Sequence, residues 1–221
     1  GSVGLIFPYT KVRILTRQGA THFRECAVDE VGEICVASPG VFEGSTYTEA
    51  DKNRELFADG HFLRTGDLGR IDAEGYLYIT GRAKDLIIRG GHNIDPAIIE
   101  EALMGHPAVA MVGAIGQPDA HAGELPCAYV ELVKGASASV DELMAHAAAH
   151  IQERAALPKF LEVLPELPKT AVGKVFKPDL RRLAITRTFD AALAEAGLPA
   201  RVLRVIEDKK RGLVAGLEKS A

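Results

Sequence analysis

The sequence predicts an α+β fold in two parts: a β-rich, β-barrel-like first part and a small second part of sheet plus helices. Up to residue 82, short apolar runs alternate with polar residues and are separated by glycines, as in strands joined by turns. After Lys84, strand-like runs alternate with two amphipathic stretches of helical period. The apolar content of 47% is enough to build cores for both parts.

In the first part, the stretches at 11–15 and 31–38 have the apolar alternation of strands and lie among turn glycines. Residues 48–56 are predicted to form a short polar helix. Residues 69–81 are predicted to form a hairpin with its turn at 72–75, and Tyr76 and Tyr78 on one face of the second strand.

In the second part, strands are predicted at 85–89, 109–115, 127–133 and 160–164. A helix over 95–105 has Asp95 as its N-cap and Pro96 in its first turn. A longer helix over 140–156 opens with the capping-box sequence Ser139-Val-Asp-Glu142.

These patterns predict four segments. Residues 1–82 form the β-rich part, 83–84 a hinge after the flexible Gly81, 85–182 the α+β unit and 183–221 an extension. Short helices are predicted at 178–184 and 188–196. The last two apolar runs, "ARVLRVIE" and "LVAGLE", are predicted to pair as a β-hairpin.

Composition narrows the class of protein. A net charge of -4 argues against nucleic-acid binding, and no apolar run reaches the roughly 20 residues of a membrane span. The N-terminus lacks a signal-peptide pattern, so a soluble, cytoplasmic protein is expected. Three cysteines without C-x-x-C spacing are expected to be buried thiols. His92, His106 and His121 lack zinc-site spacing and are interpreted as surface or structural residues, so no metal site is predicted.

Two candidate polar residues lie around the predicted hairpin. In "RTGDLG" (64–69), Asp67 lies between Gly66 and Gly69, and an exposed carboxylate there could accept hydrogen bonds from vicinal hydroxyls such as those of ribose. Taken alone, these residues are better explained by an ordinary Asp-Gly hairpin turn. Arg82 could reach the same sugar or a phosphate, or could be a surface charge.

The stretch "TGRAKDLIIRGGHNI" (80–94) places glycines and basic residues on both sides of a short apolar run, which indicates an anionic ligand or a mobile segment. Lys84 lies where the two parts meet. In "PKTAVGKVFK" (168–177), Lys174 follows Gly173 in a loop that could present its ammonium group to a distant site, or it could be an ordinary solvated lysine. This loop is not a P-loop, because Val175 follows the lysine.

The order and spacing of "RTGDLGRIDAEGYLYITGRAKDLIIRGGHNIDPAIIEEAL" and "PKTAVGKVFKPDLRR" closely resemble the adenylate-forming superfamily, and acyl-CoA synthetases in particular. The resemblance covers residues 1–182. It implies a ligase that activates a carboxylic acid with ATP, normally with Mg²⁺, to an acyl-AMP and transfers the acyl group to coenzyme A, as in fatty acid metabolism.

The resemblance also implies roles for single residues. Asp67 would hold the adenylate ribose with support from Arg82, and Lys84 would be the hinge about which a C-terminal lid domain rotates between the half-reactions. Many relatives have Asp at this hinge position, and Lys is the familiar alternative. Gly90 and Gly91 would line the path of the pantetheine arm, and Lys174 would bridge the acyl carboxylate and the α-phosphate.

The family's phosphate loop, adenine-binding segment and acyl pocket do not occur in these 221 residues. The resemblance therefore implies a C-terminal portion that works with an upstream N-domain of the same polypeptide and is inactive alone. Two alternatives remain: an acyl-AMP ligase or adenylation enzyme that loads a carrier protein, and a stand-alone interaction module without catalytic activity.

Overall fold

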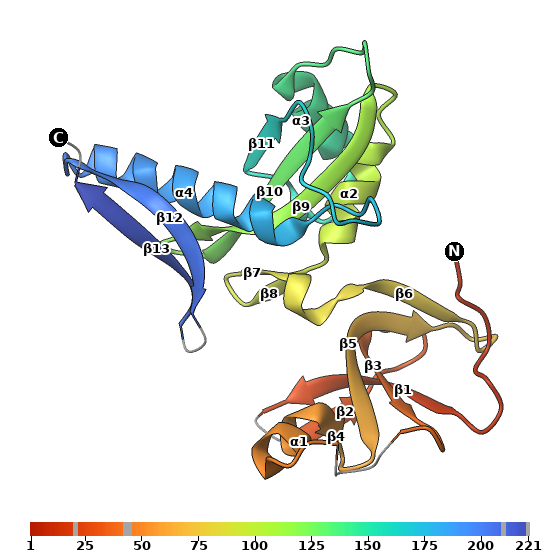
Figure 1. The fold of residues 1–221 in the computed structure, drawn as a ribbon. Coiled ribbons are helices and arrows are strands. Elements are labelled where there is room, and N and C mark those ends of the chain that lie inside the picture. Colours follow the sequence, from red (N-terminus) through yellow and green to blue (C-terminus); the bar gives the residue numbers. More distant parts are fainter. Residues whose placement is uncertain (20–21, 42–45, 209–210, 220–221) are drawn as a thin grey trace. The chain divides into compact units, whose positions relative to one another are not determined.

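The computed structural model describes residues 1–19, 22–41, 46–208 and 211–219 (Figure 1). The chain divides into two compact units, Gly1–Asp85 and Leu86–Ala221. Sheets and helices occur in both units, so the predicted α+β class is confirmed. The second unit begins at Leu86, one residue after the start at residue 85 that the sequence predicts.

The first unit is an antiparallel sheet with one short helix, α1 (Ala50–Leu56). The strands pair in the order β2-β1-β3-β5-β4, and β6 pairs with β5. No pairing among the described residues closes this sheet into a barrel. The strands are β1 (Lys11–Gln18), β2 (His22–Glu25), β3 (Gly32–Ala37), β4 (Phe57–Ala58), β5 (Phe62–Ile71) and β6 (Leu77–Arg82).

The core of the first unit is small. Leu15, Cys35 and Ala58 form its buried cluster, and Phe23 and Phe62 pack against it. The predicted hairpin is present as β5 and β6. Its turn is stabilised by Asp72, whose carboxylate accepts hydrogen bonds from the backbone N–H groups of residues 74 and 76 at 3.1 and 2.8 Å.

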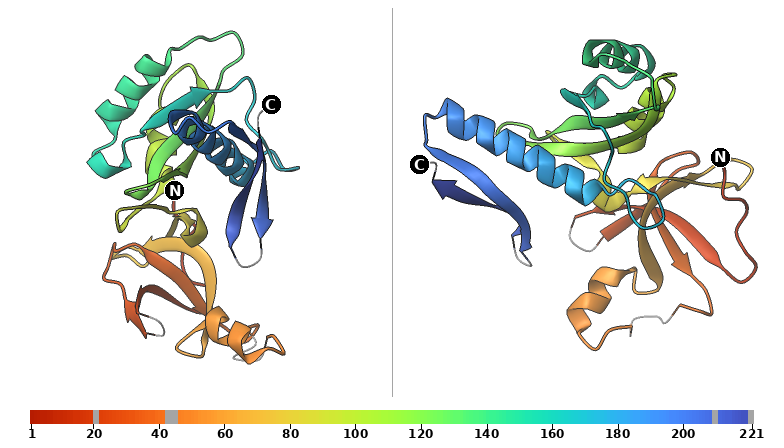
Figure 2. Two further views of the ribbon diagram at one scale, coloured as in Figure 1. Left: turned by 90° about the vertical axis from the view of Figure 1, so that its left-hand side faces the viewer. Right: turned by 45° about the horizontal axis from the view of Figure 1, so that its top comes forward.

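The second unit is a five-stranded sheet covered by helices (Figure 2). Strand β10 pairs parallel with β11 and antiparallel with β9 and β7, and β7 pairs with β8. The elements of this sheet and its helices are β7 (Ile87–Arg89), β8 (His92–Ile94), α2 (Pro96–Met104), β9 (Val109–Asp119), β10 (Gly123–Leu132), α3 (Val140–His150), β11 (Phe160–Val163) and α4 (Lys177–Glu195).

Period-two alternation in β9 and β10 builds a core on each face of this sheet. Ala128 and Val130 point to the face covered by α2 and α3, where Leu103 and Leu143 are fully buried. Cys127 and Tyr129 point to the opposite face, against the first half of α4. Both faces of the sheet are therefore covered.

Gly113 lets α4 approach this sheet closely. A Cβ atom at this position would lie 2.3 Å from Leu180 Cδ1 and 2.9 Å from Val175 Cγ1. Any side chain here would therefore displace α4 or the segment that precedes it.

The predicted helix starts of α2 and α3 are confirmed by their caps. The Asp95 side chain accepts a hydrogen bond from the Ala97 N–H, and the Ser139–Glu142 capping box is complete. The predicted end of α3 at residue 156 is wrong. Helix α3 ends at His150 because Ile151 adopts an extended conformation and its side chain enters the core; a separate 3₁₀ turn follows at Arg154–Ala156.

Helix α4 is continuous, whereas the sequence predicts two short helices in this region. No Gly or Pro interrupts residues 179–195, and the Arg187 guanidinium anchors the middle of the helix by donating a 2.6 Å hydrogen bond to Gln117 Oε1. The tail then forms the predicted hairpin from β12 (Ala200–Asp208) and β13 (Gly212–Lys219). This hairpin packs on α4, where the Val202 N–H donates to Asp190 Oδ1 at 2.6 Å.

Candidate functional site

Asp67 and Arg82 are in contact. They are paired residues on strands β5 and β6, and Arg82 Nε lies 2.9 Å from Asp67 Oδ1. The Asp67 side chain is 29% exposed and the Arg82 side chain is 58% exposed. An ion pair this accessible contributes at most about 1 kcal/mol to stability. The second carboxylate oxygen and the other guanidinium N–H groups can still meet a polar ligand, so the pair can act as an acceptor and a donor side by side.

Thr65, Gly66 and Asp67 do not form a hairpin turn but a bulge within β5, where its pairing with β3 is irregular, and hydrogen bonds hold this bulge at each residue. Gly66 has a φ of +76°, a conformation that disfavours any side chain. The Thr65 hydroxyl donates to the Ile34 carbonyl at 2.8 Å and accepts from the Asp67 N–H at 3.1 Å. The position of Asp67 is therefore fixed by contacts of its own backbone.

The partly buried Glu33 on β3 supports this bulge and was not predicted from the sequence. Its Oε1 accepts a 3.2 Å hydrogen bond from the Gly66 N–H, and its Oε2 accepts one at 2.9 Å from Arg64 Nε. A carboxylate in the middle of an apolar strand, as in "VGEICV", is the signal that could have identified it.

Lys84 lies in a short 3₁₀ helix, Ala83–Asp85, at the end of the first unit. The chain passes to the second unit two residues later. This location allows the predicted hinge role, which concerns motion and remains a prediction.

Gly90 and Gly91 form the two-residue turn between β7 and β8. Their φ angles of +55° and +87° are those of a turn that requires positive φ at both positions, which glycine adopts without strain. The Gly90 N–H donates to the Ala122 carbonyl at 2.7 Å. A Cβ atom at either glycine would meet nothing within 4 Å in this chain. Backbone conformation therefore accounts for both glycines here, and a pantetheine path remains a proposal.

A basic cavity of about 680 Å³ adjoins this turn and was not predicted. Four basic residues from two segments line it, and the Arg89 guanidinium is held there by a 2.7 Å hydrogen bond to the Ala155 carbonyl. The lining residues are Arg89, Gly90, His92, Ala122, Arg154, Ala155, Leu157 and Lys159. A site with this charge suits an anion such as a phosphate group.

Lys174 lies on an exposed, ordered loop. Lys169 and Val175 form an antiparallel bridge that closes it. The Thr170 N–H donates to the Lys174 carbonyl at 2.7 Å, and the Gly173 N–H donates to the Thr170 carbonyl at 2.8 Å. The Lys174 side chain is exposed. These backbone contacts hold the loop, and its lysine ammonium group is accessible to solvent.

The predicted site residues divide evenly between the units. Asp67, Arg82 and Lys84 belong to the first unit, and the other three residues, Gly90, Gly91 and Lys174, belong to the second.

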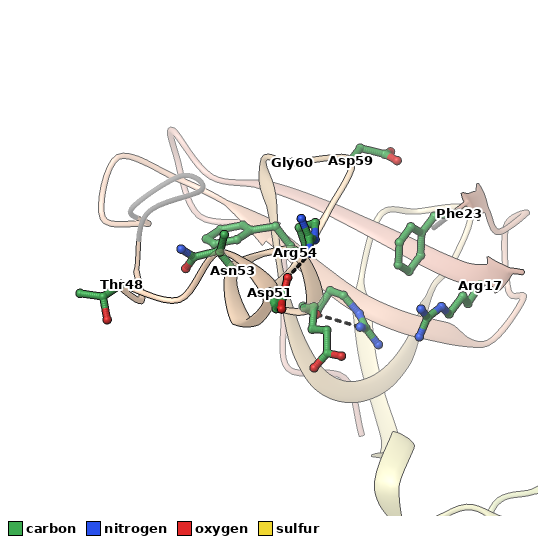
Figure 3. A pocket seen from close by; sticks show the side chains of 12 residues that line it. Arg17, Phe23, Thr48, Asp51, Asn53, Arg54, Asp59 and Gly60 are labelled. Carbon is green, nitrogen blue, oxygen red and sulfur yellow. Dashed lines mark hydrogen bonds and ion pairs between the residues drawn. The ribbon is translucent and has the colours of Figure 1, made fainter. Parts of the chain in front are cut away.

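A second cavity, of about 890 Å³, lies in the first unit and contains none of the predicted residues (Figure 3). Helix α1 contributes Asp51 and Arg54, which form an ion pair with each other. Phe23 comes from β2, and its ring lies 5.5 Å from the guanidinium of Arg64. The charged groups of this cavity are thus largely satisfied within the chain.

Within the described residues, no group of three or more His, Cys, Asp or Glu side chains is placed to hold a metal ion. No helix in the same residues is long and apolar enough to cross a membrane. Burial raises the pKa of the Cys35 thiol to about 12 and that of the Cys127 thiol to about 11, which keeps both protonated and unreactive. Cys26 is half-buried, so the expectation that all three cysteines are buried is wrong for this one.

Comparison with known proteins identifies this architecture. Residues 98–174 match the family described as AMP-binding enzyme C-terminal domain. The chain is 47% identical over 188 residues to the marinolic acid–CoA ligase of Pseudoalteromonas sp. (strain SANK 73390), an alignment that covers 85% of this chain and 28% of the relative. It is 40% identical over 177 residues to the long-chain-fatty-acid–CoA ligase of Bacillus subtilis (strain 168), covering 80% and 30%.

Solved structures agree. ATP-bound MatB from Rhodopseudomonas palustris superposes with a TM-score of 0.73 at 34% identity, covering 82% of this chain and 35% of that one. The o-succinylbenzoate CoA synthetase of Bacillus subtilis, in complex with its acyl-adenylate intermediate, gives 0.68 at 36% identity over the same shares. The chain thus belongs with the C-terminal portions of adenylate-forming enzymes. Its relatives among them are CoA ligases, and it spans about a third of their length.

Proposed function

We propose that this chain is the C-terminal part of an acyl-CoA synthetase. In the first half-reaction, a carboxylate oxygen attacks the α-phosphorus of ATP, forming acyl-AMP and releasing pyrophosphate. In the second, the thiol of coenzyme A loses its proton and attacks the acyl carbon, forming the thioester and releasing AMP. The contact between Asp67 and Arg82, at the positions implied by the family motif, is the observation that carries this proposal.

Asp67 and Arg82 fit the ribose of the adenylate. The carboxylate accepts hydrogen bonds from the two vicinal hydroxyls, and the guanidinium donates to the same sugar or to the phosphate. The hydrogen bonds from the Asp67 N–H to the Thr65 hydroxyl and from the Gly66 N–H to Glu33 keep the bulge of β5 in place, so the binding groups need little reorganisation.

Lys174 supplies the electrostatic part of adenylation. Two anions must approach each other when a carboxylate attacks a phosphate ester, and a positioned ammonium group lowers that repulsion. The exposed tip of the Gly173 loop presents the lysine to a partner surface. We further propose that rotation about Lys84 exchanges this loop for the Gly90–Gly91 turn between the half-reactions. Mg²⁺ would enter with ATP and neutralise phosphate charge in the intact enzyme.

The basic cavity beside Gly90 supports free coenzyme A as the thiol donor. Coenzyme A carries three phosphate groups on its nucleotide end, whereas a carrier-protein phosphopantetheine carries a single bridging phosphate. Arg89, Arg154 and Lys159 offer more positive charge than one phosphodiester needs.

The central test uses the longer enzyme that contains this chain. Lys174→Ala should lower the rate of acid-dependent pyrophosphate release by about 10²–10³-fold, since one electrostatic contact in the transition state is lost. Thioester formation from preformed acyl-AMP should change much less. Lys134→Ala, at an exposed lysine on another turn, is the matched control and should leave both rates unchanged. Equal losses in both half-reactions would contradict the role given to Lys174.

The acceptor is tested separately. Lys159→Ala should raise the KM for coenzyme A and leave pyrophosphate release unaffected. If free coenzyme A is not an acceptor and a holo carrier protein is, the carrier-loading alternative is correct. The purified 221-residue chain should release no pyrophosphate with any acid; an intact enzyme that also releases none would favour a non-catalytic module.

A further inference from the structure

Two histidines lie one turn apart at the end of α3. His146 and His150 are four residues apart, which places them on the same helix face. Their ring centroids are 4.1 Å apart and the rings are inclined by 30°. His150 is exposed and His146 is half-buried, so solvent reaches this pair.

Hydrogen bonds fix which nitrogen of each ring carries the proton. His146 Nε2 lies 3.1 Å from the Ala102 carbonyl, and His150 Nδ1 lies 2.8 Å from the His146 carbonyl. A carbonyl oxygen only accepts, so both of these nitrogens donate. His146 Nδ1 and His150 Nε2 are left with their lone pairs. Histidines that ligate metals have this same arrangement, with one nitrogen bound to the metal and the other donating to a carbonyl or carboxylate.

His106 is next to this pair but has no lone pair to offer. Its ring centroid is 5.0 Å from that of His146. Its Nδ1 accepts a 3.2 Å hydrogen bond from the Ala108 N–H, and its Nε2 lies 3.3 Å from Glu142 Oε1. His106 therefore packs against the pair without serving as a ligand.

We propose that His146 and His150 form a two-ligand site for a borderline divalent cation of the Zn²⁺ class, with water in the remaining positions. Imidazole nitrogen suits Zn²⁺, Ni²⁺ and Cu²⁺, and it does not suit Mg²⁺ or Ca²⁺, which prefer oxygen. Zn–N bonds of about 2.0–2.1 Å require the two nitrogens to lie roughly 3.3 Å apart in a tetrahedral site, and ring centroids 4.1 Å apart place the two side chains within reach of this spacing. The negative end of the helix dipole at His150 also favours a cation.

The site differs from a structural metal centre. With two protein ligands and no third in the described residues, the ion keeps open positions and binds reversibly. Binding joins the last two turns of α3 and stabilises the second unit according to the free ion concentration. It is independent of the proposed ligase function.

The test is a Zn²⁺ titration of the 221-residue chain, followed by the imidazole nitrogen resonances of its histidines and by calorimetry. Zn²⁺ should shift His146 Nδ1 and His150 Nε2 first, and Mg²⁺ should shift neither. His150→Ala should weaken Zn²⁺ binding by about tenfold or more, since a chelate loses one of its two ligands, which corresponds to about 1.4 kcal/mol or more.

Two further variants control for other causes. His150→Gln retains a polar side chain but no imidazole, and it should lose binding as His150→Ala does. His121→Ala, at an exposed histidine of another loop, should leave the affinity unchanged. Zn²⁺ binding that survives both His150 variants, or first shifts at other histidines or at Cys26, would overturn the proposal.

Discussion

The two units bury their apolar residues to very different extents. The second unit covers both faces of its sheet and fully buries large side chains such as Leu103 and Tyr129. The first unit has a three-residue buried cluster and leaves Phe7 and Tyr9 80% and 90% exposed. The second unit thus has the larger core, while the bulge of β5 at Asp67 in the first unit is held mainly by the hydrogen bonds of Glu33 and Thr65.

The largest expected effect comes from truncating a core leucine in each unit. Leu103→Ala should destabilise the second unit by about 2–5 kcal/mol, because a fully buried side chain leaves a cavity in a tightly packed core. Leu15→Ala should cost less, because its small cluster can collapse around the gap.

Hydrogen exchange of backbone amides reports each unit separately. Leu103→Ala should reduce protection in residues 86–208 and leave that of the first unit unchanged. If either substitution lowers the protection of both units equally, the two units unfold as one cooperative body. The proposed difference between their cores would then be wrong.

The next effect tests how closely α4 packs on the sheet. Gly113→Ala should destabilise the second unit by about 1–3 kcal/mol, because the new methyl group overlaps Leu180 and Val175. Gly216→Ala is the matched control in another strand, where a Cβ meets its nearest neighbour at an ordinary 3.6 Å. Urea unfolding of both variants measures the difference. A Gly113→Ala protein as stable as the control would show that α4 has room to move.

The sequence predicted most elements of the second unit because its strands, caps and amphipathic helices carry local signals. Asp95 and Ser139 mark helix starts that their own hydrogen bonds enforce. The end of α3 at His150 depends instead on Ile151 entering the core, which is a tertiary effect. The continuity of α4 was not predicted, although no Gly or Pro interrupts residues 179–195 and Arg187 anchors the middle of the helix to Gln117 on β9.

The candidate site was predictable only in part. Asp67, Arg82 and Lys174 were identified by motif, and the contact between the first two depends on a register shift in the hairpin after Leu68 that the sequence does not reveal. The basic cavity is assembled from segments about 30 residues or more apart, so no local pattern indicates it. Glu33 is an unusual residue for an apolar strand, but its support of the site becomes clear only from the pairing of β3 with β5.

An effect of similar size is expected from removing the charge of Glu33. Glu33→Gln should cost about 1–3 kcal/mol in the first unit, because it weakens the ion pair with Arg64 and the hydrogen bond to Gly66 in a partly buried place. In the intact enzyme, Glu33→Gln should also raise the KM for ATP, because the bulge of β5 that positions Asp67 is held less firmly. Glu25→Gln, at a more exposed carboxylate paired with Arg13, is the control and should change neither quantity measurably.

The smallest effect concerns the stability of each unit at acidic pH. One carboxylate with a lowered pKa contributes to it in each unit, Glu30 in the first and Glu131 in the second. Hydrogen bonds from Arg24 and from the Ala27 N–H lower the pKa of Glu30 to about 2, and the Leu167 N–H and Lys169 lower the pKa of Glu131. A carboxylate with a lowered pKa in the folded state stabilises that state above its unfolded pKa of about 4.3, and this stabilisation is lost as the pH falls towards the folded pKa. Glu30→Gln should therefore flatten the dependence of stability on pH between about 4.3 and 2 in the first unit only. Glu131→Gln should do the same in the second unit only. Hydrogen exchange at several acidic pH values, corrected for its intrinsic rate, measures how the stability of each unit depends on pH. If Glu30→Gln leaves this dependence unchanged in the first unit, the ion pair between Arg24 and Glu30 does not persist in solution.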